Sequence, residues 1–135
     1  MKQILLSDLE VFQKKIINKT GGSSGIRDEK LLESALMNGI LTFDGIDLYD
    51  DIEMKIAAIV YSLISNHGFI DGNKRIGVSV LILLCKLNDI KLDYTQEELV
   101  TLGITAAKGE MKKEDIYSWI YNHKDESNKE LEDKY

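Results

Sequence analysis

The chain has 135 residues, of which 44% are hydrophobic and 30% are charged, and this length suits one domain with a hydrophobic core. The formal net charge of −6 at pH 7 disfavours direct binding to nucleic acid, because such binding requires clustered lysine and arginine. The single cysteine, Cys85, excludes an internal disulfide, and its apolar neighbours indicate a core position rather than a nucleophile. No signal-peptide pattern opens the chain, and the longest apolar run, residues 78–85, is too short to span a bilayer, so we expect a cytoplasmic protein without membrane contact.

Helix signals dominate the first third of the chain, and the whole sequence contains no proline, repeat or low-complexity linker. The stretch Ser7 to Glu10 has capping-box spacing and predicts a helix to about Lys19, with Leu6 before it as a hydrophobic staple. Residues 20–25, "TGGSSG", predict a flexible turn. Asp28 is expected to cap a second helix. The apolar residues of that helix share one face, and they are Leu31, Leu32, Ala35 and Leu36.

Residues 38–51 break the helical pattern, because apolar residues partly alternate around Asp44-Gly45. This alternation around an Asp-Gly pair predicts a short hairpin or flap. Asp50 or Asp51 is expected to cap the next helix, which runs to about Asn66. The residues spaced for a buried stripe on that helix are Ile56, Ile59, Val60, Leu63 and Ile64.

The run Ile76 to Leu87 is apolar nearly all round, as expected of a central helix surrounded by others. Periodicity alone leaves a strand open for "VSVLILL", but the run continues to Asn88, a suitable C-cap, which favours the helix. A second capping box at Thr95 starts a helix toward Ala107.

Gly109 interrupts the chain before a last helix over residues 113–123, with Ile116, Trp119 and Ile120 facing inward. The remaining residues are charged, and we expect residues 125–135 to fray beyond a domain of residues 1–124. The fold class that follows is all-α, with about six or seven helices around a central apolar helix and one small β-hairpin.

The loop "NHGFIDGNKRIG", residues 66–77, carries an unusual density of polar groups between two apolar helices. Gly72 permits a tight turn, and the amides that follow open a helix whose N-terminus attracts anions. Asn73, Lys74 and Arg75 add side-chain donors, which favours a phosphate over a lone carboxylate as the ligand.

Two further groups in this loop extend the phosphate hypothesis. Asp71 would repel a phosphate unless it holds a divalent cation such as Mg²⁺, which often binds one carboxylate plus substrate oxygens. His67 is then the nearby candidate for a general base, and Phe69 is expected to anchor the loop on the core. The arrangement suits phosphoryl or nucleotidyl transfer from a nucleotide to a hydroxyl.

Each of these groups also has an ordinary interpretation. A lone histidine between helices is more often structural, Asp71-Gly72 alone is a common turn, and Lys74-Arg75 alone is a common exposed pair. The chain contains neither a P-loop nor a GxGxxG motif. The residues by themselves therefore leave the functional and the structural interpretation about equally open.

The string "HGFIDGNKR", residues 67–75, resembles the signature loop of the Fic/Doc superfamily, HxFx(D/E)GNxR. The residues that fall in place are His67, Phe69, Asp71, Gly72, Asn73 and Arg75. The similarity extends to "GGSSGIRDEKLLESAL" (residues 21–36) and "LGITAAKGEMKKEDIYSWI" (residues 102–120), which resemble segments of death-on-curing proteins. The resemblance covers nearly the whole chain through residue 123 and implies a Fic fold.

Two positions distinguish branches of this superfamily. Adenylylating members usually carry glycine where this chain has Lys74 and a second arginine where it has Val78. Doc-type toxins carry the lysine and lack the arginine, and they transfer the γ-phosphoryl group of ATP to a threonine of elongation factor Tu, which arrests translation. Gly72, however, fits the adenylylating consensus better. The resemblance implies a Doc-like kinase; adenylyl transfer and an inactive Fic-fold binding module remain alternatives.

The resemblance also implies roles for individual residues. His67 would accept the proton of the target hydroxyl, and Asp71 would bind Mg²⁺. Ser79 would be a weaker nucleotide contact, one turn into the helix. The residues that would hold phosphates are Gly72, Asn73, Lys74 and Arg75. The residues of a flap that aligns the target segment by strand addition would be Leu41, Thr42 and Phe43.

The sequence lacks the motif by which many Fic proteins inhibit themselves. Many Fic proteins are restrained by a helix with the pattern [S/T]xxxE[G/N], and here no serine or threonine is followed by glutamate four residues later. The resemblance therefore implies restraint by a separate antitoxin protein, with this chain as the toxin of the pair.

Overall fold

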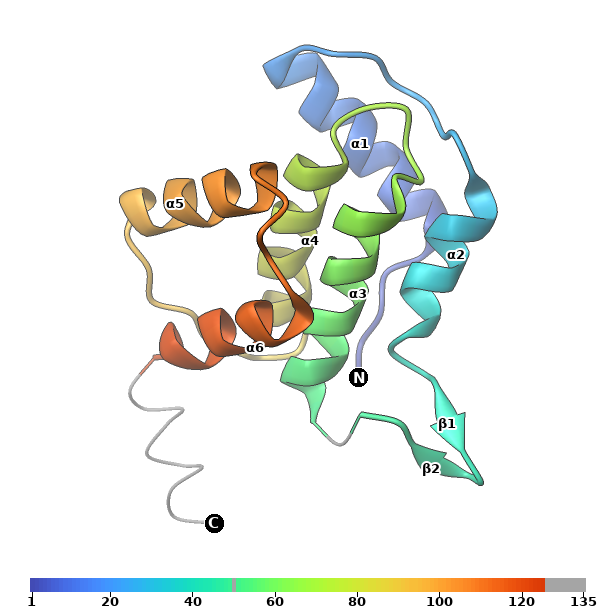
Figure 1. The fold of residues 1–135 in the computed structure, drawn as a ribbon, viewed down its shortest axis with the longest axis vertical. Helices are drawn as coiled ribbons and strands as arrows, with labels where there is room; N and C mark the ends of the chain where they lie inside the picture. Colours follow the sequence, from blue (N-terminus) through green and yellow to red (C-terminus); the bar gives the residue numbers. More distant parts are fainter. Residues whose placement is uncertain (50, 126–135) are drawn as a thin grey trace.

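The computed structural model describes residues 1–49 and 51–125, and in these residues the chain forms six helices and one two-stranded hairpin (Figure 1). In chain order the elements are α1 (Leu6–Thr20), α2 (Glu29–Met37), β1 (Thr42–Phe43), β2 (Ile46–Asp47), α3 (Ile52–Asn66), α4 (Asn73–Leu87), α5 (Gln96–Ala107) and α6 (Lys113–Asn122). The predicted all-α fold with a small hairpin is confirmed. The predicted tail, apart from Asp125, lies outside the described residues.

Helices α3 and α4 form the antiparallel centre of the bundle, so α4 shares that position with α3 (Figure 1). Helix α2 packs on α3 and α1 packs on α4, while α6 and α5 cover the same two helices from the other side. The stripe predicted for α3 is buried, and α4 buries Ile76, Val80, Leu81 and Leu84. Cys85 is also fully buried, and burial raises the pKa of its thiol to about 12, as a core position requires.

The predicted helix starts are confirmed at three of four places. Asp28 caps α2, Asp51 caps α3 and Thr95 caps α5, each by accepting backbone N–H groups of the first turn. The predicted cap at Ser7 is wrong, because α1 begins at Leu6. The capping contact comes instead from Asp8, whose carboxylate accepts the N–H of Leu5 at 2.9 Å.

The predicted hairpin forms around Asp44 and Gly45, which both have positive φ (52° and 79°), as a tight two-residue turn requires. It precedes α3 and lies at the N-terminal end of that helix, whereas the signature loop (residues 67–75) follows the C-terminal end (Figure 1). A 15-residue helix separates the two, a length of about 22 Å. The described residues include no helix long and apolar enough to cross a bilayer.

Candidate functional site

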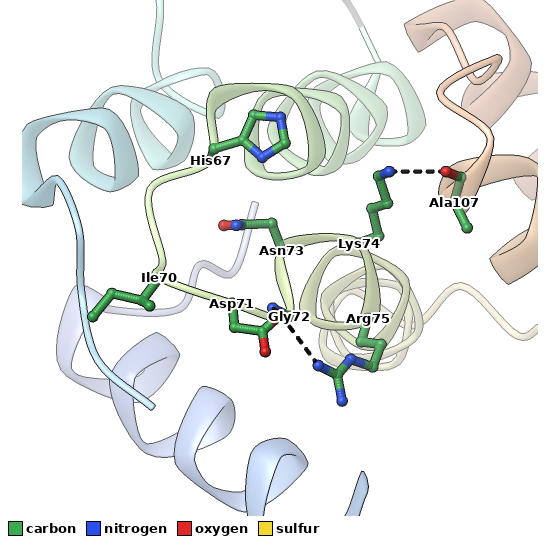
Figure 2. A pocket seen from close by; sticks show the side chains of 8 residues that line it. All are labelled: His67, Ile70, Asp71, Gly72, Asn73, Lys74, Arg75 and Ala107. Carbon is green, nitrogen blue, oxygen red and sulfur yellow. Dashed lines mark hydrogen bonds and ion pairs between the residues drawn. The ribbon is translucent and has the colours of Figure 1, made fainter. Parts of the chain in front are cut away.

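The signature loop forms one wall of a pocket of about 370 Å³ where the chain passes from α3 to α4 (Figure 2). The residues that line the pocket are His67, Ile70, Asp71, Gly72, Asn73, Lys74, Arg75 and Ala107. All but Ala107 come from nine consecutive positions, residues 67–75, so the turn between two helices gathers the polar groups of the loop on one open face.

His67 is the first residue after α3, and its backbone is left-handed, with φ 52° and ψ 47°. This conformation ends the helix and turns the chain toward the pocket, where the exposed imidazole lies (Figure 2). Arg27 fixes this turn: its Nε donates to the carbonyl of His67 at 2.7 Å, and its Nη2 donates to that of Asn66 at 3.2 Å. The histidine is therefore held by its backbone while its ring faces the pocket.

The last part of the signature loop is the N-terminus of α4. Gly72 has φ 78°, and its carbonyl accepts the first intrahelical bond, from the N–H of Ile76 at 2.8 Å. The N–H groups of the three residues between them precede that bond and therefore have no partner within the helix. Such amides, together with the positive end of the helix dipole, favour an anion in the pocket.

Asn73 braces the loop from inside. Its side chain is buried, its Oδ1 accepts the N–H of Phe69, and its Nδ2 donates to the carbonyl of Phe69, both at 3.0 Å. Phe69 itself is 1% exposed, so the predicted anchor on the core is confirmed. The amide side chain of Asn73 is thus committed to the loop, and the group it leaves for a phosphate is its backbone N–H.

Asp71 and Arg75 form a pair one helical turn apart, with 3.6 Å between Oδ1 and Nη2. The carboxylate also accepts the N–H of Gly72 at 2.8 Å and that of Ser23 at 3.3 Å. These backbone bonds, that of Gly72 first, lower the pKa of Asp71 below its ordinary value, and Arg75 adds to the effect. Asp71 is thus a stable carboxylate beside the anion-attracting helix end.

Lys74 connects the pocket to a distant element. Its Nζ donates to the carbonyl of Ala107 at 2.8 Å, at the last residue of α5 (Figure 2). A cation at a helix C-terminus is favourable, because it satisfies a carbonyl that has no partner within the helix. In this structure the ammonium is directed to α5, and it would have to leave Ala107 to reach a phosphate.

The structure brings six of the ten sequence-predicted site residues into this pocket, from His67 to Arg75. Ser79 is half-buried on α4 and does not line it. Of the predicted flap, residues 42 and 43 form strand β1 of the hairpin, which lies at the opposite end of α3 from the pocket.

Among the residues that contact the signature loop from other parts of the chain, Arg27 and Gln13 do so through their side chains, and the sequence analysis predicted neither. Gln13 donates to the carbonyl of Asp71 at 3.1 Å from α1. A signal for Gln13 existed, because it is a polar residue four positions from both Leu9 and Ile17 in the buried stripe of α1. Arg27 offered no comparable signal.

The donor set of the pocket fits magnesium held jointly with a nucleotide. Asp71 supplies one carboxylate with accepting capacity beyond its two N–H bonds, and Mg²⁺ commonly binds one or two carboxylates plus substrate phosphates. Within residues 1–49 and 51–125, no three His, Cys, Asp or Glu side chains are grouped as a metal site of their own. A metal at Asp71 would thus depend on oxygens from the substrate.

Comparison of the sequence with known proteins identifies the family to which the chain belongs. A sequence model described as the Fic/DOC family matches residues 3–85, more than half of the chain, including the whole signature loop. The chain belongs to the Fic/DOC family. It is also 35% identical over 72 residues to Toxin Doc of Mycolicibacterium smegmatis (strain ATCC 700084 / mc(2)155), a match that covers 53% of this chain and 55% of that protein.

The region matched by the family model contains every residue that lines the pocket except Ala107. The matched region ends inside α4, at Cys85, so it contains α1, α2, the hairpin, α3 and the part of α4 that carries the loop. Helices α5 and α6 lie outside it, although α5 contributes Ala107 to the pocket. The chain spans about half the length of the curated relative that it matches.

Proposed function

We propose that this chain is a Doc-like toxin that transfers the γ-phosphoryl group of ATP to a hydroxyl group of a target protein. The observation that carries the proposal is the convergence of a histidine, a carboxylate and a helix N-terminus flanked by Lys74 and Arg75 in one pocket. Similarity to a protein named Toxin Doc supports the same branch of the family.

The chemistry assigns the base to His67. As the hydroxyl oxygen of the target forms a bond to the γ-phosphorus, the imidazole accepts the hydroxyl proton. The bond from the γ-phosphorus to its bridging oxygen breaks, and ADP leaves. General-base catalysis of this kind contributes about 10²–10⁴-fold to a rate.

The helix end and Arg75 hold the phosphate chain. The N–H groups of Asn73, Lys74 and Arg75 would receive phosphate oxygens, and the guanidinium of Arg75 would add a planar fork. Asp71 would hold Mg²⁺ together with those oxygens, and the cation would neutralise charge that develops on them. Ser79 and the Lys74 ammonium are further candidate contacts.

The expected target is a threonine of a translation factor such as elongation factor Tu, whose modification would arrest translation. The expected partner is an antitoxin protein, since the sequence contains no inhibitory [S/T]xxxE[G/N] motif. A segment that folds on binding would suit this role, because it can wrap over an open pocket.

The experiment that tests the reaction compares two labels on ATP. The purified chain is incubated with a translation extract, Mg²⁺ and ATP labelled at either the γ or the α phosphorus. We expect a protein band labelled from γ-ATP and none from α-ATP, with loss of the band when Mg²⁺ is chelated. Label from the α position would replace phosphoryl transfer with adenylyl transfer, the alternative that Gly72 keeps open.

A catalytically inactive binding module is the second alternative. It predicts no protein label from either nucleotide while the chain still inhibits growth when expressed. The intact set of His67, Asp71 and Arg75 around one pocket favours the enzyme over this alternative.

A further inference from the structure

Gln13 occupies a position in α1 where the sequence pattern calls for an apolar residue. It lies in the buried stripe between Leu9 and Ile17, and its side chain is only 2% exposed. Burying an amide costs free energy unless its donors and acceptor are bonded. The partners of this amide therefore indicate why a polar residue occupies the position.

The amide of Gln13 joins two segments that are far apart in the sequence. Its Nε2 donates to the carbonyl of Ser23 at 3.2 Å and to that of Asp71 at 3.1 Å. Its Oε1 accepts the N–H of Gly25 at 3.2 Å. Both donors and the acceptor are used, and all three partners are backbone groups.

The first of these segments, residues 21–25, which we call the glycine segment, lies directly against the proposed site. Its Ser23 N–H donates to Oδ2 of Asp71, and its Gly21 carbonyl accepts from Nη1 of Arg75 at 2.9 Å. A Cβ added to Gly22 would lie 2.3 Å from Oδ2 of Asp71. The position of the glycine segment thus limits where both charged side chains can stand.

We infer that Gln13 is a positioning residue of the site. Its side chain fixes the glycine segment relative to the backbone of Asp71, and so orients the Asp71 carboxylate and the Arg75 guanidinium before a nucleotide binds. The inference rests on the proposed function, since the site must bind a magnesium nucleotide for this orientation to matter. When a residue that orients a metal-binding side chain is removed, metal affinity or activity typically falls by about 10–100-fold.

The main test replaces Gln13 by methionine, which keeps the length of the side chain and removes its three bonds. Binding of the imido analogue of ATP, which is not hydrolysed, is measured by calorimetry with and without Mg²⁺. We expect the affinity for the magnesium complex to fall about 10–100-fold in Gln13→Met. Amide hydrogen exchange at Ser23 and Gly25 should become faster in the same variant, while exchange in α3 should stay unchanged.

Asn88→Leu is the matched control, because the side-chain amide of Asn88 also makes three hydrogen bonds to backbone groups. Its Nδ2 donates to the carbonyls of Lys2 and Leu84, and its Oδ1 accepts the N–H of Lys2. These bonds lie at the opposite end of α4 from the pocket. We expect Asn88→Leu to lower the melting temperature and to bind the nucleotide as the wild type does.

Gly22→Ala provides a second test that leaves Gln13 intact. The added methyl group conflicts with the Asp71 carboxylate, and φ 117° is unfavourable for alanine, so the glycine segment must shift. We expect this variant to lose affinity for the magnesium nucleotide, as Gln13→Met does.

The possible outcomes separate this inference from the proposed function. If the wild type fails to bind the magnesium nucleotide, the proposed function fails and the inference fails with it. If the wild type binds, and Gln13→Met and Gly22→Ala bind equally well, only the inference is overturned. An equal loss of affinity in Asn88→Leu would also overturn it, because general destabilisation would then explain the effect.

Discussion

The two histidines of the chain occupy equivalent local positions in two different regions, each as the residue after a helix. His67 follows α3 in the region that contains the pocket. His123 follows α6, and its Nδ1 contacts the carbonyl of Trp119 at 2.7 Å while its Nε2 pairs with Glu98 of α5. Its ring also stacks on Trp119 with 4.1 Å between the ring centroids.

The two imidazole rings differ in whether their nitrogens are already hydrogen-bonded within the protein. Among the described residues the ring of His67 has no hydrogen-bond partner, whereas both nitrogens of His123 are engaged. On the α5–α6 side, the His123 ring pairs with Glu98 and with the carbonyl of Trp119, whereas on the α3–α4 side the His67 ring faces an open pocket. A histidine whose backbone is fixed and whose ring has no partner can accept a proton from a substrate. A histidine whose ring is hydrogen-bonded within the protein stabilises the fold.

The largest expected effect comes from removing the two rings separately. His67→Ala should lower phosphoryl transfer by about 10²–10⁴-fold while leaving the melting temperature and nucleotide binding almost unchanged. His123→Ala should keep the transfer rate and lower the free energy of unfolding by about 1–2 kcal/mol, through the lost hydrogen bonds and ring stacking. Labelled-product assays and thermal unfolding of both variants provide the measurements.

The variant His67→Ala can also contradict the proposed difference between the two histidines. Growth inhibition by His67→Ala at the level of the parent protein would mean that toxicity needs no base at this position. The chain would then act as a binding module, and the free ring would carry no functional meaning.

Lys74 links the two regions, since it belongs to the pocket and is bonded to Ala107 of α5. Lys74→Gly should shift the label on the target from the γ toward the α phosphorus, because loss of the side chain opens space beside the amides of α4. Lys74→Met is the control, since it retains the bulk without the charge, and we expect it to remain a phosphoryl transferase. Unchanged product ratios in Lys74→Gly would show that another residue orients the nucleotide.

Two glycines within helices test how closely each region is packed. A Cβ on Gly77 of α4 would lie 2.4 Å from Cγ1 of Ile64 on α3, whereas a Cβ on Gly103 of α5 would meet nothing within 4 Å. Overpacking costs about 1–3 kcal/mol and the helix propensity of alanine recovers about 1, so Gly77→Ala should lose about 1 kcal/mol of stability. Gly103→Ala should gain about 1 kcal/mol, which is about 4 °C in melting temperature. Shifts of the same sign would contradict the difference in packing.

The sequence predicted the parts of this structure that depend on neighbouring residues. The helices follow from apolar stripes and caps, and the pocket follows from a loop whose groups are nearly contiguous. The start of α1 was wrong because Ser7 and Asp8 both offer capping side chains, and spacing alone does not decide between the two frames. The contacts of Gln13 with Asp71 and of Arg27 with His67 span 58 and 40 residues, and only the packing of α1 and of the segment before α2 against the loop creates them.

The smallest expected effect concerns the ionisation of Glu98. The N–H of Thr95 first, and then His123, lower the pKa of Glu98 below its ordinary value of 4.5. A lowered pKa in the folded state means that the ionised carboxylate stabilises the fold above pH 4.5, and that this contribution is lost as the pH falls through the folded value. Thermal unfolding from pH 3 to pH 7 should therefore show a difference in melting temperature between wild type and Glu98→Gln that is present at neutral pH and disappears in acid.

Glu97→Gln is the control, because it removes the same charge from the same helical turn and leaves the bonds of Glu98 in place. Its melting temperature should follow that of the wild type. A difference that instead grows toward acid would show that the Thr95 and His123 bonds do not favour the ionised form of Glu98.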